Sequence, residues 1–331
     1  MRREGGYRRR NGTDAVMHAL RAHTRGGPEV LVYEQAPTPT LADGEILVQV
    51  HAAAITFAEL TWQETWTRNG VDRTPIIPSH EFSGVVAEVG GGIDGFTLAQ
   101  EVYGLVPFDR DGAAADYVAV PADQAAVKPK SLSHIEAAAL PLPALTAQQA
   151  LFDHAHLGAG ERVLVHGGAG GVGGYAVQMA AAAGAEVTAT SIGAVGYVKE
   201  LGAHEVIDVR TNDFSTRTGA FDVVLDTVGG DTLDRSYPVL RPGGRLVTLQ
   251  VPPDQHRVAQ LDITAIFFIV TTDTVALTKL AALVDSAGLR VTIAATFPLS
   301  EGAAAYTSGA RAGRRPGKTV LTVRKHGLRT H

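Results

Sequence analysis

The sequence predicts an α/β protein built from two units, an open, doubly wound parallel sheet and a β-rich domain. Strand-like and helix-like runs alternate between about residues 160 and 290, which is typical of a parallel sheet with right-handed crossovers. Before residue 126, short valine-rich runs are separated by glycine turns, which indicates antiparallel strands. A chain of 331 residues is long enough to form a core in each unit.

Composition excludes several classes of protein. The chain has no cysteine, so disulfides and thiolate zinc sites are excluded. Its net charge of −5 argues against broad attraction to nucleic acid, and no apolar run is long enough to cross a bilayer. We therefore expect a cytoplasmic protein that binds neither nucleic acid nor membranes. Residues 1–16 are rich in arginine and glycine, and we expect them to be a disordered extension or to precede the true start.

The first unit is expected to consist of short strands. Glu45 to Ala54 alternates and is rich in valine, as a strand should be. Residues 58–68 can form a short helix that carries Trp62 and Trp66. The expected strands cover residues 29–33, 45–54, 82–89, 100–106 and 117–120.

The second unit is expected to alternate strands and helices. Ser133 to Glu136 has the spacing of a capping box and predicts a helix start. We expect the prolines within residues 140–143 to interrupt this helix, which resumes from Thr146 to His154. The remaining expected elements are strands at residues 163–165, 186–190, 205–209, 222–228, 245–251, 291–295 and 318–324, and helices at 175–183 and 276–288.

A glycine-rich turn follows the first of these strands. It contains a complete G-x-G-x-x-G pattern at Gly168, Gly170 and Gly173. We assign Gly168 to a tight turn, Gly170 to close approach of a pyrophosphate, and Gly173 to close packing of helix on strand. Free N–H groups at Gly171 and Val172, with the positive end of the helix dipole, then face an anion. A flexible glycine turn is the alternative, but the strand–turn–helix–strand context favours a bound dinucleotide.

The end of the second strand bears on the choice of dinucleotide. NAD-selective folds carry an acid here for the ribose 2′-OH, and residues 190–199 contain none. Ser191 can accept a 2′-phosphate, and Lys199 or Tyr197 can assist. No arginine stands at the strand end, so the sequence favours NADPH while leaving NADH possible. Alternatively, Ser191 caps the following helix.

The ordered motifs of the chain resemble those of medium-chain dehydrogenases/reductases, in the zinc-independent, quinone-oxidoreductase-like branch. The resemblance runs from Met17 almost to the C-terminus. It implies a GroES-like β-barrel catalytic domain at residues 17–140 and 296–331, a Rossmann domain at 141–295, an active site between them, and a homodimer. The motifs are Gly26-Gly27-Pro28-Glu29-Val30-Leu31, residues 81–86, Val102-Tyr103-Gly104-Leu105, Ala138-Ala139-Leu140-Pro141, residues 166–173, residues 226–230, Pro242-Gly243-Gly244 and Gly317-Lys318-Thr319-Val320-Leu321.

The resemblance also addresses metal binding. Zinc-dependent relatives hold their catalytic metal with a cysteine, a histidine and a second cysteine, and the matching positions here are Thr56, His80 and Leu142. One imidazole does not make a zinc site, so we expect no metal. His154 and His156 form an H-x-H pair without an evident third ligand.

No Lewis acid is expected to stabilise negative charge on a substrate oxygen. The favoured reaction is therefore hydride transfer to a conjugated acceptor, in which the negative charge delocalises. We therefore expect an NADPH-dependent reductase of quinones or α,β-unsaturated carbonyls. One alternative is an enoyl reductase that acts on a natural-product (polyketide) intermediate. Another is a redox sensor that binds NADPH without turnover.

The resemblance suggests further site residues, each with an alternative. Thr146 matches a threonine at the nicotinamide or caps a helix, and Thr56 can bond ribose or substrate oxygen. Trp62 and Trp66 wall the acceptor pocket or belong to the core. Lys318 reaches the pyrophosphate or is a solvated strand-end lysine. The cofactor is also expected to lie over Val228 and beside Phe267, Phe268 and Val270, which can alternatively form an apolar subunit contact.

Overall fold

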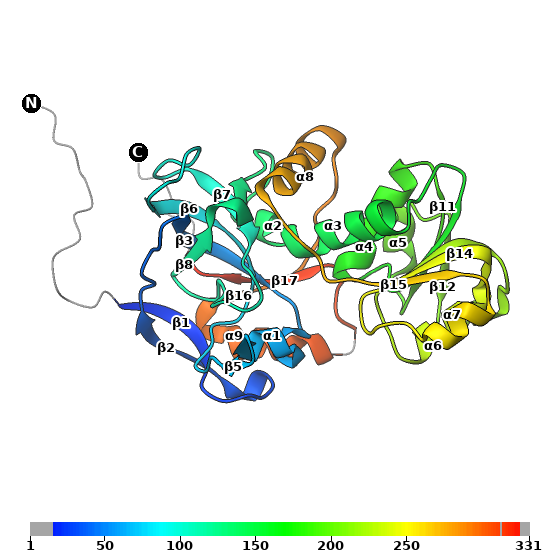
Figure 1. Ribbon diagram of the computed structural model, residues 1–331, viewed down its shortest axis with the longest axis horizontal. Coiled ribbons are helices and arrows are strands. Elements are labelled where there is room, and N and C mark those ends of the chain that lie inside the picture. The colour runs from blue at the N-terminus through cyan, green and yellow to red at the C-terminus, as the bar shows by residue number, and fades with distance from the viewer. Residues whose placement is uncertain (1–15, 312, 325–331) are drawn as a thin grey trace, which may run out of the picture.

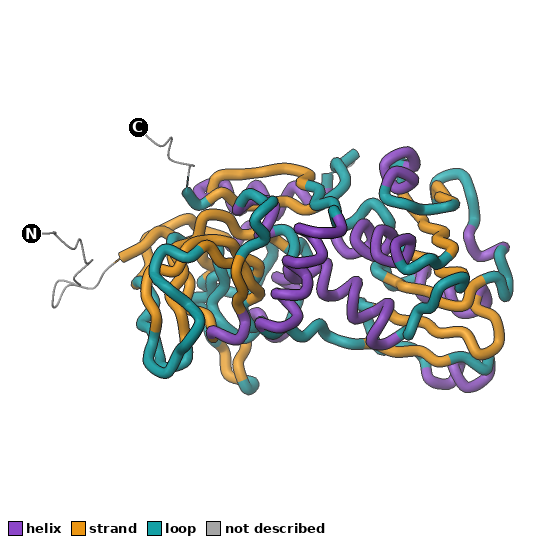
Figure 2. Tube along the Cα trace, turned by 90° about the horizontal axis from the view of Figure 1, so that it is seen from above, coloured by secondary structure: helices purple, strands orange, loops and turns teal. Residues whose placement is uncertain are grey.

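The computed structural model describes residues 16–311 and 313–324. It has two lobes with helices between them, a strand-rich lobe near both chain ends and a second lobe formed by the middle of the chain (Figures 1 and 2). The disorder expected for residues 1–15 lies outside the described residues, but Val16 begins a strand and so does not belong to a separate tail. None of the helices within the described ranges is long and apolar enough to span a membrane.

The strand-rich lobe contains a seven-stranded sheet in the order β16-β17-β3-β6-β7-β9, with β8 paired to β3. A hydrogen-bonded pair, β1 and β2, lies beside it. The sheet combines both ends of the described chain because β17 pairs antiparallel with β3. The strands are β1 (Val16–Ala22), β2 (Leu31–Pro37), β3 (Glu45–Ile55), β6 (Glu81–Val89), β7 (Glu101–Leu105), β8 (Tyr117–Pro121), β9 (Ala125–Val127), β16 (Ile293–Pro298) and β17 (Lys318–Thr322).

The second lobe is a six-stranded parallel sheet in the order β12-β11-β10-β13-β14-β15. The chain winds outward from β10 in one direction and from β13 in the other, so the carboxyl ends of these two strands form the switch point where ligands bind in such sheets. Its elements are β10 (Arg162–Val165), α4 (Gly171–Ala182), β11 (Glu186–Ser191), α5 (Val195–Glu200), β12 (Glu205–Asp208), β13 (Phe221–Asp226), α6 (Asp231–Ser236), β14 (Leu240–Thr248), α7 (Gln255–Gln260), β15 (Thr264–Phe267) and α8 (Thr274–Ala287).

The helices that join the lobes differ from expectation. The capping box of α2 (His134–Ala138) is present, with Ser133 and Glu136 bonded reciprocally. The next helix does not resume at Thr146, because α3 spans Pro141–Gln148 and continues as a π-helical turn over Gln149–His154. Pro141 begins the helix instead of breaking it, since a proline at the first helical position lacks only an N–H that would be unpaired anyway.

Two other elements also differ. The helix expected over residues 58–68 is limited to a 3₁₀ turn (Glu59–Thr61) and α1 (Gln63–Trp66). The strand expected at residues 291–295 is β16, which runs parallel to β17 in the barrel sheet. The division into a barrel domain and a Rossmann domain at residues 140 and 295 remains a prediction, and β16 shows that barrel pairing begins at Ile293.

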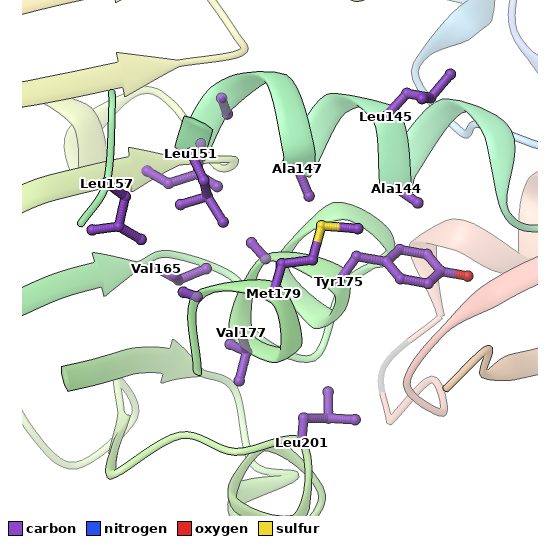
Figure 3. Close-up of a cluster of buried hydrophobic side chains, with 14 of the residues drawn as sticks. Ala144, Leu145, Ala147, Leu151, Leu157, Val165, Tyr175, Val177, Met179 and Leu201 are labelled. Atoms are coloured by element: carbon purple, nitrogen blue, oxygen red, sulfur yellow. The ribbon is translucent and has the colours of Figure 1, made fainter. Parts of the chain in front are cut away.

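The main core joins the linking helices to the parallel sheet. Figure 3 shows Ala144 and Ala147 of α3 facing Tyr175 and Met179 of α4. Small side chains on α3 let the two helices approach closely while the larger ones fill the space between them. This packing fixes α3, which comes from the barrel side, against the helix that begins at the glycine turn.

Candidate active site

The glycine turn connects β10 to α4 and is held by close contacts. Gly167 takes the left-handed conformation, with a φ of 72°, so the tight turn assigned to Gly168 belongs to its neighbour. A Cβ on Gly168 would lie 2.9 Å from the Cβ of Ala189. A Cβ on Gly173 would lie 2.1 Å from the carbonyl oxygen of Gly167. These glycines therefore let α4 start directly behind the turn.

The start of α4 provides donors for an anion. Gly170 is the N-cap residue and contributes no side-chain cap. The first-turn N–H groups at Gly171 and Val172 have no intrahelical acceptor, because the helix begins there. Both residues are half-buried. A helix start with free N–H groups and no Cβ at the mouth suits a pyrophosphate, so these residues fit a dinucleotide.

Lys318 lies at this mouth and connects the two lobes. A Cβ on Gly171 would be 3.1 Å from the Cδ of Lys318, which places the lysine stem against the start of α4. The Nζ atom donates to Thr56 Oγ1 at 3.1 Å and to the buried carboxylate of Glu81. Burial raises the pKa of Glu81, and Lys318 opposes that shift. The backbone N–H of Leu142 donates to the same carboxylate at 3.2 Å.

Behind Thr56 lies a buried acid that sequence reasoning missed. Glu59 accepts hydrogen bonds from the backbone N–H groups of Thr56 at 3.2 Å and Ser79 at 2.9 Å, and from the hydroxyl of Tyr306. Burial raises the pKa of Glu59 to about 7. An acid in the otherwise apolar run of residues 57–60 was the available sequence signal, whereas nothing local indicated Tyr306.

His80, which the family resemblance matches to a metal ligand of zinc-dependent relatives, is surrounded here by other groups. Its Nε2 lies 3.8 Å from Glu59 Oε2, and its ring packs edge-on against Phe108. Burial lowers the pKa of His80 to about 3, so the ring is neutral at pH 7. The donor set does not fit zinc, because Thr56 bonds Lys318 and position 142 is a leucine. Within the described ranges, no three His, Asp or Glu side chains gather as a metal group.

The two tryptophans have different environments. Trp66 is buried in the barrel core and donates from Nε1 to the carbonyl of Leu60 at 2.8 Å, so it does not wall a pocket. Its assignment to the substrate site is wrong, and the core alternative holds. Trp62 is partly exposed and packs edge-on against Phe108, with ring centroids 5.3 Å apart.

Thr146 is not a helix cap. It lies inside α3, and its hydroxyl donates to the carbonyl of Leu142 at 2.6 Å.

On the other side of the glycine turn, Val228 follows β13, is 52% exposed, and donates its N–H to Asp226. The valine is therefore accessible, and the placement of the cofactor over this turn stays a prediction.

β15 is the edge strand of the parallel sheet, and the segment that follows it carries the remaining predicted cofactor residues. Phe267 ends β15, and the ring of Phe268 packs on His154 at 4.3 Å. The backbone of Thr271 bonds the side chain of Gln149 in both directions, at 2.7 and 3.1 Å. Val270, one residue earlier, packs against the main core. This clamp holds the segment against the π-helical turn.

The residues predicted for the 2′-phosphate are separated. Ser191 ends β11 and is buried; it does not cap α5, whose N-cap is Ala194. Tyr197 donates its hydroxyl to Thr292 at 3.0 Å and so is turned toward residues that follow α8. Lys199 is exposed on α5.

Comparison with known proteins settles the family. Residues 42–130 match the alcohol dehydrogenase GroES-like domain model, and residues 201–321 match the model of zinc-binding dehydrogenases. The chain is 32% identical over 309 residues to the 2-methylene-furan-3-one reductase of Solanum lycopersicum, across 89% of this chain and 76% of that protein. The chain belongs to the medium-chain dehydrogenase/reductase superfamily. It is thus an oxidoreductase, and the resemblance seen in its motifs is confirmed.

Solved structures of this superfamily agree in fold. The quinone oxidoreductase from Coxiella burnetii matches with a TM-score of 0.85 and 30% identity, over 94% of this chain and 100% of that chain. The CurK enoyl reductase matches with a TM-score of 0.81 and 26% identity, over 92% and 99% of the two chains. The predicted pairing of a GroES-like barrel with a Rossmann sheet is therefore confirmed.

Proposed function

We propose that this medium-chain reductase uses NADPH, without zinc, to reduce a quinone or an α,β-unsaturated carbonyl. The observation that carries the proposal is the donor set at the mouth between the lobes. Thr56, His80 and Leu142 stand where relatives hold zinc, while the adjacent glycine turn is shaped for a pyrophosphate. Relatives named as a quinone oxidoreductase and a 2-methylene-furan-3-one reductase support the same acceptor classes.

The acceptor class follows from how charge is stabilised. Bound NADPH supplies a hydride, and an acceptor that takes it gains negative charge. An isolated ketone concentrates that charge on one oxygen and needs a strong Lewis acid. A conjugated acceptor delocalises it, so ordinary hydrogen-bond donors suffice.

Thr56 is the donor that we assign to the substrate oxygen. Its Oγ1 accepts from Lys318 Nζ, which leaves its own proton for another acceptor. Glu59 accepts from the Thr56 backbone N–H and thereby fixes the backbone that carries the hydroxyl. Lys318 adds positive charge beside the oxygen, and its stem lines the path from the glycine turn. Trp62 and Phe108 supply aromatic surface for a flat ring.

Steady-state oxidation of NADPH and NADH tests the proposal. The acceptors are 9,10-phenanthrenequinone, a simple enone and an isolated ketone. We expect turnover with the first two, a preference for NADPH, and no measurable rate with the ketone. Equal or faster ketone reduction would contradict the proposal, and tight NADPH binding without turnover on any acceptor would favour a redox-sensing protein.

An enoyl reductase acting on a polyketide intermediate is the second candidate, favoured by the likeness to the CurK enoyl reductase. A short enoyl thioester distinguishes the two. A kcat/KM for the thioester well above that for the free enone would indicate recognition of a carrier-bound acyl chain.

A further inference from the structure

The loop after β11 brings a guanidinium to the adenosine end of the dinucleotide site. In a fold of this kind, the adenosine ribose lies beside the end of the second strand of the sheet unit, which here ends at Ser191. Gly193 follows with a φ of 68°. A Cβ on Gly193 would lie 3.3 Å from Nη2 and 3.5 Å from Cζ of Arg210. The glycine therefore lets the guanidinium lie against the loop backbone.

Arg210 reaches this loop from the neighbouring strand. Ser191 and Asp208 are paired in the parallel register of β11 and β12, so the two strands end side by side. Arg210 stands two residues beyond that pair. Nothing within residues 190–199 indicates Arg210, because it follows the third strand of the sheet unit in the sequence.

Asp208 sets the orientation of Arg210. The carboxylate accepts from Nε at 2.9 and 3.2 Å and from Nη2 at 2.6 Å. The N–H of Gly193 donates to the same carboxylate at 3.4 Å. These bonds to Arg210 hold the pKa of Asp208 well below its usual range, so the acid is ionised.

One edge of the guanidinium remains available. Asp208 takes the Nε–Nη2 edge, and no described residue accepts a hydrogen bond from Nη1. The Arg210 side chain is 60% exposed, which lets a ligand reach it. The Ser191 hydroxyl at the same strand end is buried and has no partner within the described ranges. An unpaired buried hydroxyl is costly, so this strand end holds a polar group that the described chain leaves unsatisfied.

We propose that Arg210 selects NADPH over NADH by donating from its Nη1 edge to the 2′-phosphate, with Asp208 as the positioning residue. The inference rests on the proposed function, since it takes the dinucleotide to bind at the glycine turn. Hydrogen bonds between guanidinium and phosphate are charge-assisted and stronger than neutral ones. The 2′-OH of NADH carries no such charge and gains little from Arg210.

Calorimetric binding of 2′,5′-ADP and 5′-AMP tests this without turnover. The two probes differ in the 2′-phosphate. The variants are Arg210→Ala, Arg210→Lys and, as a matched control, Arg217→Ala, which removes an arginine of 43% exposure paired with Glu205 at the other end of β12. We expect Arg210→Ala to weaken 2′,5′-ADP binding about tenfold and leave 5′-AMP binding unchanged. Arg210→Lys should retain part of the affinity, and the control should match the wild type.

Three results would overturn the inference, and they are distinguishable. If Arg210→Ala keeps the wild-type preference for 2′,5′-ADP, another group reads the phosphate. If the wild type binds both probes equally, no 2′-phosphate subsite exists. If the wild type binds neither NADPH nor NADH, the proposed function itself fails. Equal melting temperatures of the variants establish that folding is intact.

Discussion

Gly173 shows at the level of one residue how the cofactor turn is built. Replacing it with alanine puts a Cβ 2.1 Å from the carbonyl oxygen of Gly167. The start of α4 must then move away from the turn, at a cost of about 1–3 kcal/mol in the free energy of unfolding. We expect Gly173→Ala to lose most of its affinity for the dinucleotide. Quenching of the protein's tryptophan fluorescence on titration with NADPH measures this affinity.

Gly196 provides the control. It lies in α5, and a Cβ there would meet no atom within 4 Å. Gly196→Ala should raise stability by up to about 1 kcal/mol and leave NADPH affinity unchanged, because alanine is the better helix former. If Gly173→Ala and Gly196→Ala change NADPH affinity equally, a steric clash with the carbonyl of Gly167 is not the reason that position 173 requires glycine.

Glu59 predicts a specific pH dependence of stability. Its pKa is about 7 in the folded chain and near the ordinary value of 4.5 when unfolded. The folded state therefore binds more protons between pH 4.5 and 7, so stability falls as the pH rises through this window. The effect amounts to roughly 3 kcal/mol across the full window.

The Glu59→Gln variant isolates this contribution. Burial lowers the pKa values of His80 and His166 to about 3, so these two residues make stability rise with pH below pH 6.5. The pH dependence of wild-type stability alone therefore does not isolate Glu59. We expect the stability difference, wild type minus Glu59→Gln, to decrease between pH 5 and pH 8 in urea titrations. A difference independent of pH would show that Glu59 is ionised throughout.

At the scale of elements, the contact between β7 and α8 ties the barrel to the last long helix. The buried hydroxyl of Tyr103 donates to the carbonyl of Leu277 at 2.6 Å. Tyr103→Phe removes this bond and leaves the carbonyl its helical role alone, which should cost about 1 kcal/mol in the free energy of unfolding. Tyr33→Phe, at a tyrosine that is 41% exposed, should change stability little in the same urea titrations. Equal losses would contradict the role of this bond.

The elements also show what local sequence can predict. Strands such as β3 and β10 are marked by apolar patterns, and the capping box at Ser133 fixes a helix start. The placement of β16 was missed because its pairing with β17 is a long-range choice between two sheets. A proline predicts either a helix break or a first helical turn, and local sequence does not decide between the two at Pro141, which begins α3.

The residues of the candidate site also differ in whether local sequence can predict them. The glycine turn is contiguous, so its spacing, together with the strands and helix that flank it, predicts a dinucleotide site. Glu59 and Tyr306 are 247 residues apart, and their contact exists only once the last part of the chain closes the barrel. Arg210 likewise acquires its place through the parallel register of β11 and β12.

For the whole molecule, Lys318 is the side chain that links barrel and glycine turn. Lys318→Met removes the cation beside the start of α4. If that cation acts on the pyrophosphate, which NADPH and NADH have in common, we expect the affinity for both to fall together, by about tenfold, with their ratio unchanged. Glu81 is then left buried without its cation, with the N–H of Leu142 still donating to it, which also destabilises the fold. Adding Glu81→Gln should restore the melting temperature without restoring affinity. If affinity returns with stability, Lys318 acts through folding alone.

The most direct test of metal-free hydride transfer is turnover by enzyme whose metal content is known. The protein is dialysed against a strong chelator, its zinc content is measured by mass spectrometry, and NADPH oxidation by 9,10-phenanthrenequinone is then followed with and without added zinc. The donor set of Thr56, His80 and Leu142 predicts full activity at far less than one zinc per chain, with no gain on zinc addition. Loss of activity on chelation, restored by one equivalent of zinc, would contradict it.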